Sequence, residues 1–307
     1  MDYLRECIAS IYQNTHKITF EIIVVDNASP QDDVDLLKID FPEVRIIKSG
    51  VNVGFAGANN IGVKASAGEY VLFLNPDTKL VGPTIEILLN HARALPQSGI
   101  VGCKMLNTDL SVQITSIQKF PTILNQIVNS EYLLSRWPNC PIWNIGPLFS
   151  NQTQPVKVEV IPGACMLLRR DVFERVGMFS EDYFMYAEDL DLNYKLKKAG
   201  YTNYYVGDAV IIHHGGGSSS QQKLNQWATV MKYRAMTRYY RKTHGRFYEK
   251  LYRLTTGCVA IARLAILAIL YPLGNKFWDR QSRRNATEKW KVVLKWAFES
   301  QDLAVGK

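Results

Sequence analysis

The turn Asn75–Asp77 places oxygen-bearing side chains directly after the apolar run 70–74. An oxygen ligand at the end of a strand could bind a hard cation such as Mg²⁺ that bridges a diphosphate. A proline-containing β-turn without a ligand is the simpler interpretation of these three residues taken alone. Later in the chain, His213 and His214 could supply an imidazole ligand. Successive strand side chains point to opposite faces, so we expect one of these histidines at most to face such a site.

Acidic side chains at positions 188, 189 and 191 open the segment 188–199, which ends with lysines. Acids at the start and bases at the end match the dipole of an α-helix, and this structural role explains all of them. A carboxylate at this place could instead be a general base that takes a proton from a reacting hydroxyl group. The residues alone leave both interpretations open.

Two further features follow predicted strands near the start of the chain. Asp26 ends the apolar run 20–25, where its carboxylate could accept hydrogen bonds from a nucleobase, although an ordinary turn also fits. Glycines in the segment Gly54–Asn60 would let a phosphate approach a helix N-terminus, although a tight strand-to-helix turn is an equally good explanation. The segment is neither a GxGxxG fingerprint nor a Walker loop, which excludes the usual NAD-binding and P-loop sites.

The elements that must position these groups alternate between strands and helices. This alternation predicts an α/β fold with a mostly parallel central sheet, in which ligands bind beyond the carboxyl ends of the strands. From about residue 107 to residue 155 the periodicity fades, which predicts a long connecting region. We expect strands at 20–25, 44–47, 70–74, 100–103, 156–161, 164–168 and 206–214, and helices at 2–12, 32–39, 57–67, 84–94 and 188–199.

Charge divides the chain into two regions. Residues 1–220 hold 18 basic and 23 acidic residues, whereas residues 221–307 hold 18 basic and 5 acidic residues, a net charge of +13. We expect a catalytic domain at 1–220 and a basic, helical, membrane-associated region at 221–307. The acidic first region argues against nucleic acid as a partner. The apolar stretch 257–273, interrupted by Arg263, favours an interfacial helix at an anionic membrane over a core helix or a membrane span.

The cysteines and the N-terminal residues indicate a reducing compartment. Five cysteines are scattered along the chain without a CxxC pair, so neither a disulfide framework nor a zinc site is expected. The first residues lack the basic and apolar regions of a signal peptide. We therefore expect a cytoplasmic protein, peripheral at the inner face of the cell membrane.

The order of the motifs is more specific than any motif alone. Between residues 2 and 220 it resembles the family 2 glycosyltransferases, and within them the rhamnosyltransferase-like branch with the A-type glycosyltransferase fold. The resemblance rests on the segments VVDNAS, NVGFAGANNIG, LFLNPDT, PGACMLLRRDVFERVGMF, FMYAEDLDLNYKLKKAG and HHGGGS.

The resemblance implies an inverting, metal-dependent transfer of a sugar from a nucleotide-diphosphate donor. The donor implied is dTDP-rhamnose, with UDP-hexoses as the alternative, and the acceptor is a hydroxyl of a glycan or a lipid-linked molecule in cell-surface polysaccharide synthesis. The metal implied is Mg²⁺ or Mn²⁺. By resemblance the residues on the nucleotide side are Asp26, Asn52, Gly54, Asn60 and Asn75. The metal ligands are Asp77 and His213, with His214 as a substitute. Gly163 and Ala164 lie near the donor sugar and acceptor, and Asp189 is the catalytic base with Glu188 beside it.

The resemblance also implies a strand before the first helix, in the middle of the sheet. The sequence begins at that helix, so we expect the run 20–25 to lack a strand partner on one side. Two other functions stay open as hypotheses. One is an inactive or truncated membrane-associated binding homologue, and the other is a nucleotidyltransferase, although no glycine-rich loop with basic residues follows the first strand.

Overall fold

The computed structural model describes residues 1–30, 33–128, 131–143, 145–149, 154–215, 226–270 and 280–299. They form two compact units, the first within 1–121 and 128–217 and the second within 122–127 and 218–307. The boundary expected between residues 220 and 221 lies outside the described residues, as do residues 271–273 of the apolar stretch.

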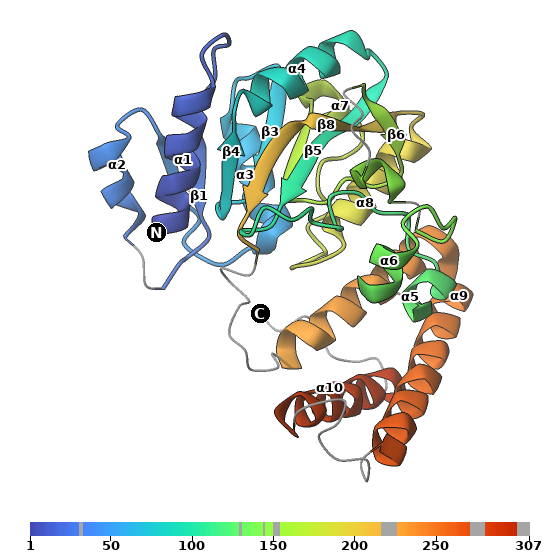
Figure 1. Ribbon diagram of the computed structural model, residues 1–307. Helices are drawn as coiled ribbons and strands as arrows, with labels where there is room; N and C mark the ends of the chain where they lie inside the picture. Colours follow the sequence, from blue (N-terminus) through green and yellow to red (C-terminus); the bar gives the residue numbers. More distant parts are fainter. Residues whose placement is uncertain are drawn as a thin grey trace. The chain divides into compact units, whose positions relative to one another are not determined.

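The first unit contains two sheets (Figure 1). In the smaller sheet β1 (Ile23–Asp26) pairs in parallel with β2 (Arg45–Lys48), and this is the only strand partner of β1 among the described residues. The larger sheet has the order β3-β7-β5-β8-β4, with β6 also paired to β8. Its strands are β3 (Tyr70–Leu74), β4 (Thr78–Val81), β5 (Ser98–Leu106), β6 (Val156–Val158), β7 (Cys165–Arg169) and β8 (Thr202–His213).

The α/β class is confirmed, and the larger sheet is mixed. β5 and β8 run in parallel, whereas β3–β7, β5–β7, β4–β8 and β6–β8 are antiparallel pairs. The buried apolar runs did not distinguish these directions, because an antiparallel strand covered by helices on both faces has the same composition as a parallel one.

Helices cover both faces of the larger sheet. Alternating residues of β5 and β7 show this directly, since Val101 and Leu167 pack under one layer and Ile100 and Met166 under the other. The first layer includes α1 and α4, and the second includes α3, α7 and α8. The helices of this unit are α1 (Asp2–Asn14), η1 (Val34–Leu36), α2 (Leu37–Asp40), α3 (Gly54–Ala65), α4 (Thr84–Ala94), α6 (Glu131–Arg136), η2 (Gly146–Phe149), α7 (Arg170–Arg175) and α8 (Glu188–Lys198).

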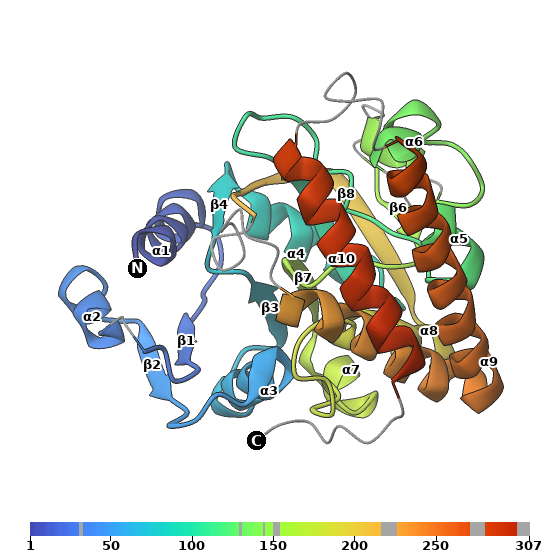
Figure 2. The same cartoon turned by 90° about the horizontal axis from the view of Figure 1, so that it is seen from below.

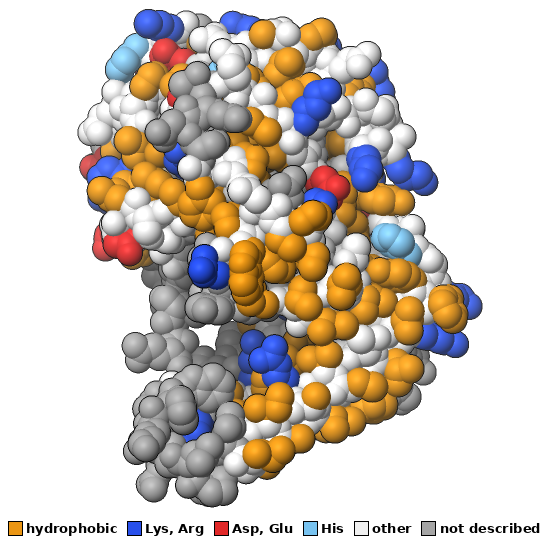
Figure 3. All heavy atoms as spheres, turned by 45° about the vertical axis from the view of Figure 1, so that its right-hand side comes forward, with side chains coloured by type: hydrophobic (Ala, Val, Ile, Leu, Met, Phe, Trp, Pro, Cys, Tyr) orange, Lys and Arg blue, Asp and Glu red, His pale blue; other side chains and the backbone are white. Residues whose placement is uncertain are grey.

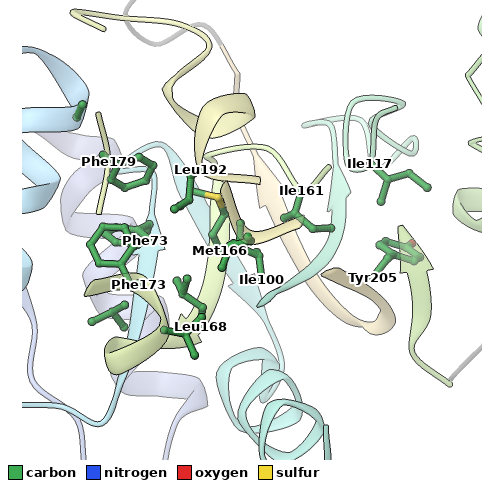
Figure 4. Packing of buried hydrophobic residues seen from close by; sticks show 14 of the residues in the cluster. Phe73, Ile100, Ile117, Ile161, Met166, Leu168, Phe173, Phe179, Leu192 and Tyr205 are labelled. Atoms are coloured by element: carbon green, nitrogen blue, oxygen red, sulfur yellow. The ribbon is translucent and has the colours of Figure 1, made fainter. Parts of the chain in front are cut away.

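The larger core lies on the α8 side of the sheet. Phe73, Phe173 and Phe179 pack with ring centroids 4.8–5.4 Å apart, and Leu192 of α8 lies over the central strands (Figure 4). Residues of the predicted connecting region, Ile117 among them, are also buried here, so part of that region belongs to the core. In the same unit, α1 and α2 pack against the β1–β2 pair (Figure 2).

The second unit is helical among its described residues. It comprises α5 (Ile123–Val128), α9 (Gln226–Leu270) and α10 (Arg280–Phe298), and α9 bends at Gly245, whose φ is 85°. Val293 and Trp296 of α10 are buried, 0% and 3% exposed. The stretch 290–296, which alternates basic and apolar residues as interfacial helices do, thus uses these apolar side chains for internal packing.

Candidate active site

The turn after β3 and the end of β8 bring Asn75, Asp77 and His213 together. β4 pairs with β8 so that Thr78 lies opposite His213, which sets the turn residues beside the histidine. The Nε2 atom of His213 lies 3.4 Å from Oδ1 of Asp77 and 3.4 Å from Nδ2 of Asn75. The side chains of His213 and Asp77 are 16% and 17% exposed. An imidazole, a carboxylate and an amide thus share a largely buried position.

Gln113 determines which nitrogen of His213 carries the proton. Its Nε2 atom donates to the backbone oxygen of His213 at 3.1 Å and to Oδ1 of Asn107 at 3.0 Å. A backbone oxygen only accepts hydrogen bonds, so the other amide atom, Oε1, must be the one that faces Nδ1 of His213 at 2.9 Å. Nδ1 is therefore protonated in the neutral ring, and Nε2 directs its lone pair toward Asp77 and Asn75.

Asp77 and His213 fit a divalent cation. The Nε2 lone pair and the Asp77 carboxylate are both electron donors, and both are ordinary ligands of Mn²⁺ or Mg²⁺. Among the residues that the structure describes, no group of three or more His, Cys, Asp or Glu side chains converges as a metal site. Mg²⁺ is nevertheless commonly held by one or two protein ligands with phosphate oxygens and water completing its shell. These two residues would thus hold the metal together with a bound diphosphate.

His214 is turned toward a different group. Its Nε2 atom lies 3.4 Å from Oε2 of Glu6, and its ring centroid lies 4.8 Å from that of Tyr3. The opposite directions of His213 and His214 follow from the alternation of side chains along an extended chain. Of the two histidines, the one beside Asp77 is His213.

Asp189 lies in the first turn of α8, against the residues that precede β7. Its Oδ2 atom accepts a hydrogen bond from the Gly163 N–H at 3.1 Å, and Oδ1 accepts one from the Leu190 N–H at 2.8 Å. The next residue, Ala164, accepts a hydrogen bond from the Asn75 N–H at 3.0 Å. Two consecutive residues therefore link the Asp189 carboxylate to the turn that carries Asp77.

The start of α8 is held firmly by its neighbours. Tyr186 and Ala187 both have positive φ, 72° and 63°, and such strained backbone is often found at functional sites. Asn193, fully buried, bonds both the N–H and the carbonyl of Ile161, at 3.0 and 2.9 Å. These bonds fix α8 against the Gly163–Ala164 turn.

Glu188 and Asp189 are two carboxyl groups with raised pKa values. Glu188 is 7% exposed, and its Oε2 atom has no hydrogen-bond partner among the described residues. Burial, and then the charge of Asp189, raise the pKa of Glu188 to about 8, so this group is mostly protonated at neutral pH. Burial also raises the pKa of Asp189, against the hydrogen bonds from the Gly163 and Leu190 N–H groups. Asp189 is thus a stronger base than a solvent-exposed aspartate.

The residues after β1 and before α3 form a second group. Asp26 ends β1, and its Oδ1 accepts a hydrogen bond from the Ser29 N–H at 3.0 Å. The Asn52 Oδ1 atom accepts hydrogen bonds from the Gly54 N–H and from Nδ2 of Asn27, both at 3.0 Å. Asn27 Nδ2 also donates to the Gly54 carbonyl at 3.1 Å. These bonds fasten the end of β1 to the first turn of α3.

The first turn of α3 meets the loop before α8. Gly54 has a φ of 75°, and a Cβ at this position would lie 2.3 Å from the Phe184 carbonyl oxygen, so only glycine fits. The Phe55 N–H donates to the same oxygen at 3.0 Å. Asn60 is 3% exposed, and its side chain makes three hydrogen bonds to residues 179–181. Its polar atoms therefore hold this loop against α3.

Three residues that organise the site were not predicted from the sequence. Asn27 stands inside the motif VVDNAS, and Asn193 inside the motif of α8, so both carried a signal. Gln113 lies in the region without periodicity and carried none. Only the pairing of β5 with β8 brings that region beside His213.

Comparison with known proteins shows the family to which this chain belongs. Residues 1–177 match the family described as "Glycosyl transferase family 2", and residues 115–289 match "Glycosyl transferase family group 2". This protein belongs to glycosyl transferase family 2. The resemblance seen in the motifs, the fold class and the assignment as a glycosyltransferase are thereby confirmed.

Rhamnosyltransferases are among the similar family 2 glycosyltransferases. An N-acetylglucosaminyl-diphospho-decaprenol L-rhamnosyltransferase of Mycobacterium tuberculosis is 30% identical over 223 residues, which cover 68% of this chain and 71% of that protein. Rhamnosyltransferase WbbL of Escherichia coli is 28% identical over 214 residues, covering 67% of this chain and 76% of that protein.

Two solved structures share the A-type glycosyltransferase fold. The mannosyltransferase PcManGT of Pyrobaculum calidifontis, in complex with GDP-Man and Mn²⁺, superposes with a TM-score of 0.59 and 16% identity, covering 96% of this chain and 82% of that one. GalNAc-T7 with UDP, GalNAc and Mn²⁺ superposes with a TM-score of 0.56 and 11% identity, covering 94% of this chain and 52% of that one. At these identities the likeness establishes the fold.

Proposed function

We propose that this family 2 glycosyltransferase transfers L-rhamnose from dTDP-rhamnose to a hydroxyl of a glycan or lipid-linked acceptor in cell-surface polysaccharide synthesis. The donor sugar is supported by the names of two relatives, both rhamnosyltransferases. The lipid-linked acceptor is supported by one of them, whose name gives a diphospho-decaprenol substrate. UDP-hexoses are the alternative donors.

The observation that carries the proposal is the link between the two halves of the site. The Asp189 carboxylate holds Gly163, and the next residue holds the turn of Asn75 and Asp77. A sugar diphosphate bound with its phosphates beside Asp77 and His213 would present its anomeric carbon near this turn, within reach of an acceptor that Asp189 contacts. Asp26 and the hydrogen-bonded turn of Asn27 and Asn52 would bind the nucleoside.

The chemistry is a direct displacement with inversion at the anomeric carbon. Asp189 takes the proton of the acceptor hydroxyl, and its raised pKa favours this step. The hydroxyl oxygen forms the new bond to the anomeric carbon as the bond to the diphosphate oxygen breaks, and the nucleoside diphosphate leaves with that electron pair. Glu188, protonated at neutral pH, leaves a single carboxylate charge at the base position. A divalent metal would neutralise the departing diphosphate.

Residues 221–307 would hold the enzyme at the inner face of the cell membrane. Their net charge is +13, and α9 from Gln226 to Ile269 is, among the described helices, the one long and apolar enough to cross a membrane by length and composition. A basic, apolar region of this kind is attracted to anionic lipid. The catalytic region 1–220 would then work at the membrane surface, where lipid-linked acceptors lie.

The test combines nucleotide binding with transfer. The protein is titrated calorimetrically with dTDP, UDP and GDP, each with Mn²⁺ and with EDTA, and rhamnosyl transfer from dTDP-rhamnose to a prenyl-diphospho-N-acetylglucosamine acceptor is followed by mass spectrometry. We expect metal-dependent dTDP binding and transfer with inversion, measured as the anomeric configuration of the product by NMR.

The variant Asp189→Asn separates catalysis from binding. It keeps the size of the side chain, so dTDP binding should stay within about twofold, whereas transfer should fall by at least ~10²-fold because the general base is lost. Transfer that survives in Asp189→Asn would refute the assignment of the base. Binding of UDP or GDP in preference to dTDP would refute the rhamnosyl donor and leave the glycosyltransferase assignment intact.

A further inference from the structure

The second half of α9 presents a continuous apolar stripe on its outer side. From Phe247 onward, exposed apolar residues recur at steps of four and three residues, which is the spacing of one helix face. Figure 3 shows hydrophobic side chains gathered over the surface on this side. The stripe consists of Phe247, Leu251, Leu254, Cys258, Ile261, Ala265 and Ala268, all exposed, and Ile266 and Ile269 widen it at its end.

The inner side of the same helix segment packs against α10. Tyr252 and Ala260 are 3% and 0% exposed, and a Cβ on Gly257 would lie 2.9 Å from the Phe298 ring. The Arg253 guanidinium donates to the carbonyls of Trp296 and Ala297. The stripe therefore faces away from α10, and α10 does not cover it.

From Leu254 to Ala268 the stripe carries no charge on its face, and the exposed Lys250 lies at its start. Arg263 is the only charged residue between 254 and 269, and its guanidinium lies 5.7 Å from the ring centroid of Trp290, on the α10 side. The segment 241–253 before it holds five basic residues and one acid, and α10 holds six basic residues and one acid.

We infer that this stripe docks into the surface of an anionic lipid bilayer. A second copy of the chain is the other occupant that an apolar stripe of this spacing could accept. Two copies would bring two strongly basic regions together, and that repulsion opposes dimerisation. Anionic headgroups instead match the flanking lysines and arginines, while acyl chains receive the apolar residues.

The packing of α10 indicates that α9 lies in the plane of the membrane and does not cross it. The 23 residues from Phe247 to Ile269 span about 34 Å at about 1.5 Å per residue, long enough to cross. α10, however, packs along the inner side of α9 and carries seven charged residues in 19. A spanning α9 would carry these charges into the hydrocarbon, whereas an in-plane helix leaves them at the headgroups. The inference rests on the proposed function, because docking of the stripe would bring the active site to lipid-linked acceptors.

Cys258, in the middle of the stripe, allows a direct test. Cys7, Cys103 and Cys165 are buried and Cys140 is partly buried, so an environment-sensitive fluorophore can be attached to Cys258 in a Cys140→Ser background. Emission is recorded with vesicles of phosphatidylcholine and with vesicles that also contain phosphatidylglycerol. Lipids with quenchers at a shallow or a deep acyl position then report the depth of the fluorophore.

Matched variants separate the stripe from general charge effects. Leu254→Glu places an acid on the stripe, and Leu110→Glu makes the same change at an equally exposed leucine of the first unit, 63% against 56% exposed. We expect the fluorophore emission to shift to the blue with anionic vesicles and to be quenched more strongly from the shallow position. Leu254→Glu should weaken vesicle binding at least ~10-fold, whereas the binding of Leu110→Glu should stay within about twofold of the parent.

Each contrary outcome overturns a definite part of the inference. Absence of binding, or equal binding by both glutamate variants, rejects the stripe as the docking surface. Stronger quenching from the deep position means that α9 crosses the membrane. A lipid-free dimer in sedimentation velocity that Leu254→Glu dissociates identifies a second copy as the occupant. Metal-dependent binding of dTDP is measured on the same samples, so failure of the stripe and failure of the glycosyltransferase proposal are told apart.

Discussion

Replacement of Gln113 by leucine should weaken metal binding without touching either proposed metal ligand. In the structure, the Gln113 Oε1 atom accepts a hydrogen bond from Nδ1 of His213 at 2.9 Å, and Nε2 donates to the backbone of the same residue. Leucine has a similar volume and neither bond. The ring of His213 would then rotate or adopt the other tautomer, and Nε2 would no longer direct a lone pair toward Asp77.

The expected magnitude follows from the role of the bond. Loss of a partner that orients a metal-ligating histidine costs roughly 10–100-fold in metal affinity, or about 1.4–2.7 kcal/mol. Stability should fall by about 1–3 kcal/mol, because the largely buried Nδ1–H loses its acceptor. Gln113→Glu keeps an acceptor for Nδ1–H and should restore most of the affinity, which a purely structural role of Gln113 would not predict.

The assay is calorimetric titration of Mn²⁺ in the presence of saturating dTDP, with ¹⁵N NMR of His213 as an independent reading of the tautomer. His214→Ala is the matched control, since His214 is directed toward Glu6, and its Mn²⁺ affinity should equal that of the parent. Unchanged Mn²⁺ affinity in Gln113→Leu, with the parent tautomer in the NMR spectrum, would refute the positioning role. A loss of affinity in His214→Ala as large as that in His213→Ala would show that the wrong histidine was assigned.

Three further predictions concern the frame of the site. Glu188→Gln should stabilise the ligand-free protein, relative to the parent, increasingly as pH rises from 4.5 to 8. The pKa of Glu188 is higher in the folded state, so the parent binds more protons folded than unfolded and loses up to roughly 5 kcal/mol of stability over this range. Urea unfolding at several pH values measures the difference between the two proteins, and a difference independent of pH would contradict the raised pKa. Gly54→Ala should cost about 2–4 kcal/mol of stability, because the new Cβ would lie 2.3 Å from the Phe184 oxygen. It should also weaken dTDP binding. Chemical denaturation and calorimetry measure the two effects, and parent-like stability would mean that the loop before α8 does not dock against Gly54. Asn193→Leu should cost about 2–5 kcal/mol of stability, because it leaves the buried N–H and carbonyl of Ile161 without partners. It should also lower the rate of transfer more than the affinity for dTDP. An equal loss of rate and affinity would argue against a specific effect on the Asp189 turn.

Much of the fold could be read from the chain because its signals are local. The helix at 84–94 and the strand at 70–74 were predicted with the bounds that the structure has, since periodicity and apolar runs are properties of neighbouring residues. The order of the motifs along the chain was sufficient to indicate the family. The same reasoning could not see that the six-stranded sheet is mixed, because strand direction depends on which strands pair.

The active site divides in the same way. The residue types of the acid pair, the Asn75–Asp77 turn and the two histidines were sufficient to propose a base and a metal site. The family resemblance put His213 before His214 as the metal ligand. The tertiary structure gives the reason that His213 faces Asp77, because the direction of each side chain depends on the register of β8 against β4. It also brought Gln113 to His213 across 100 residues of sequence.

Net charge and apolar content are sums over the chain, so the sequence by itself determined that residues 221–307 are basic and partly apolar. Which apolar residues are available to a partner depends on what covers them. The structure buries Val293 and Trp296 against α9 and leaves the stripe from Phe247 to Ala268 exposed. Composition therefore predicted a basic and apolar surface in residues 221–307, and only the packing of α9 with α10 decided which residues form it.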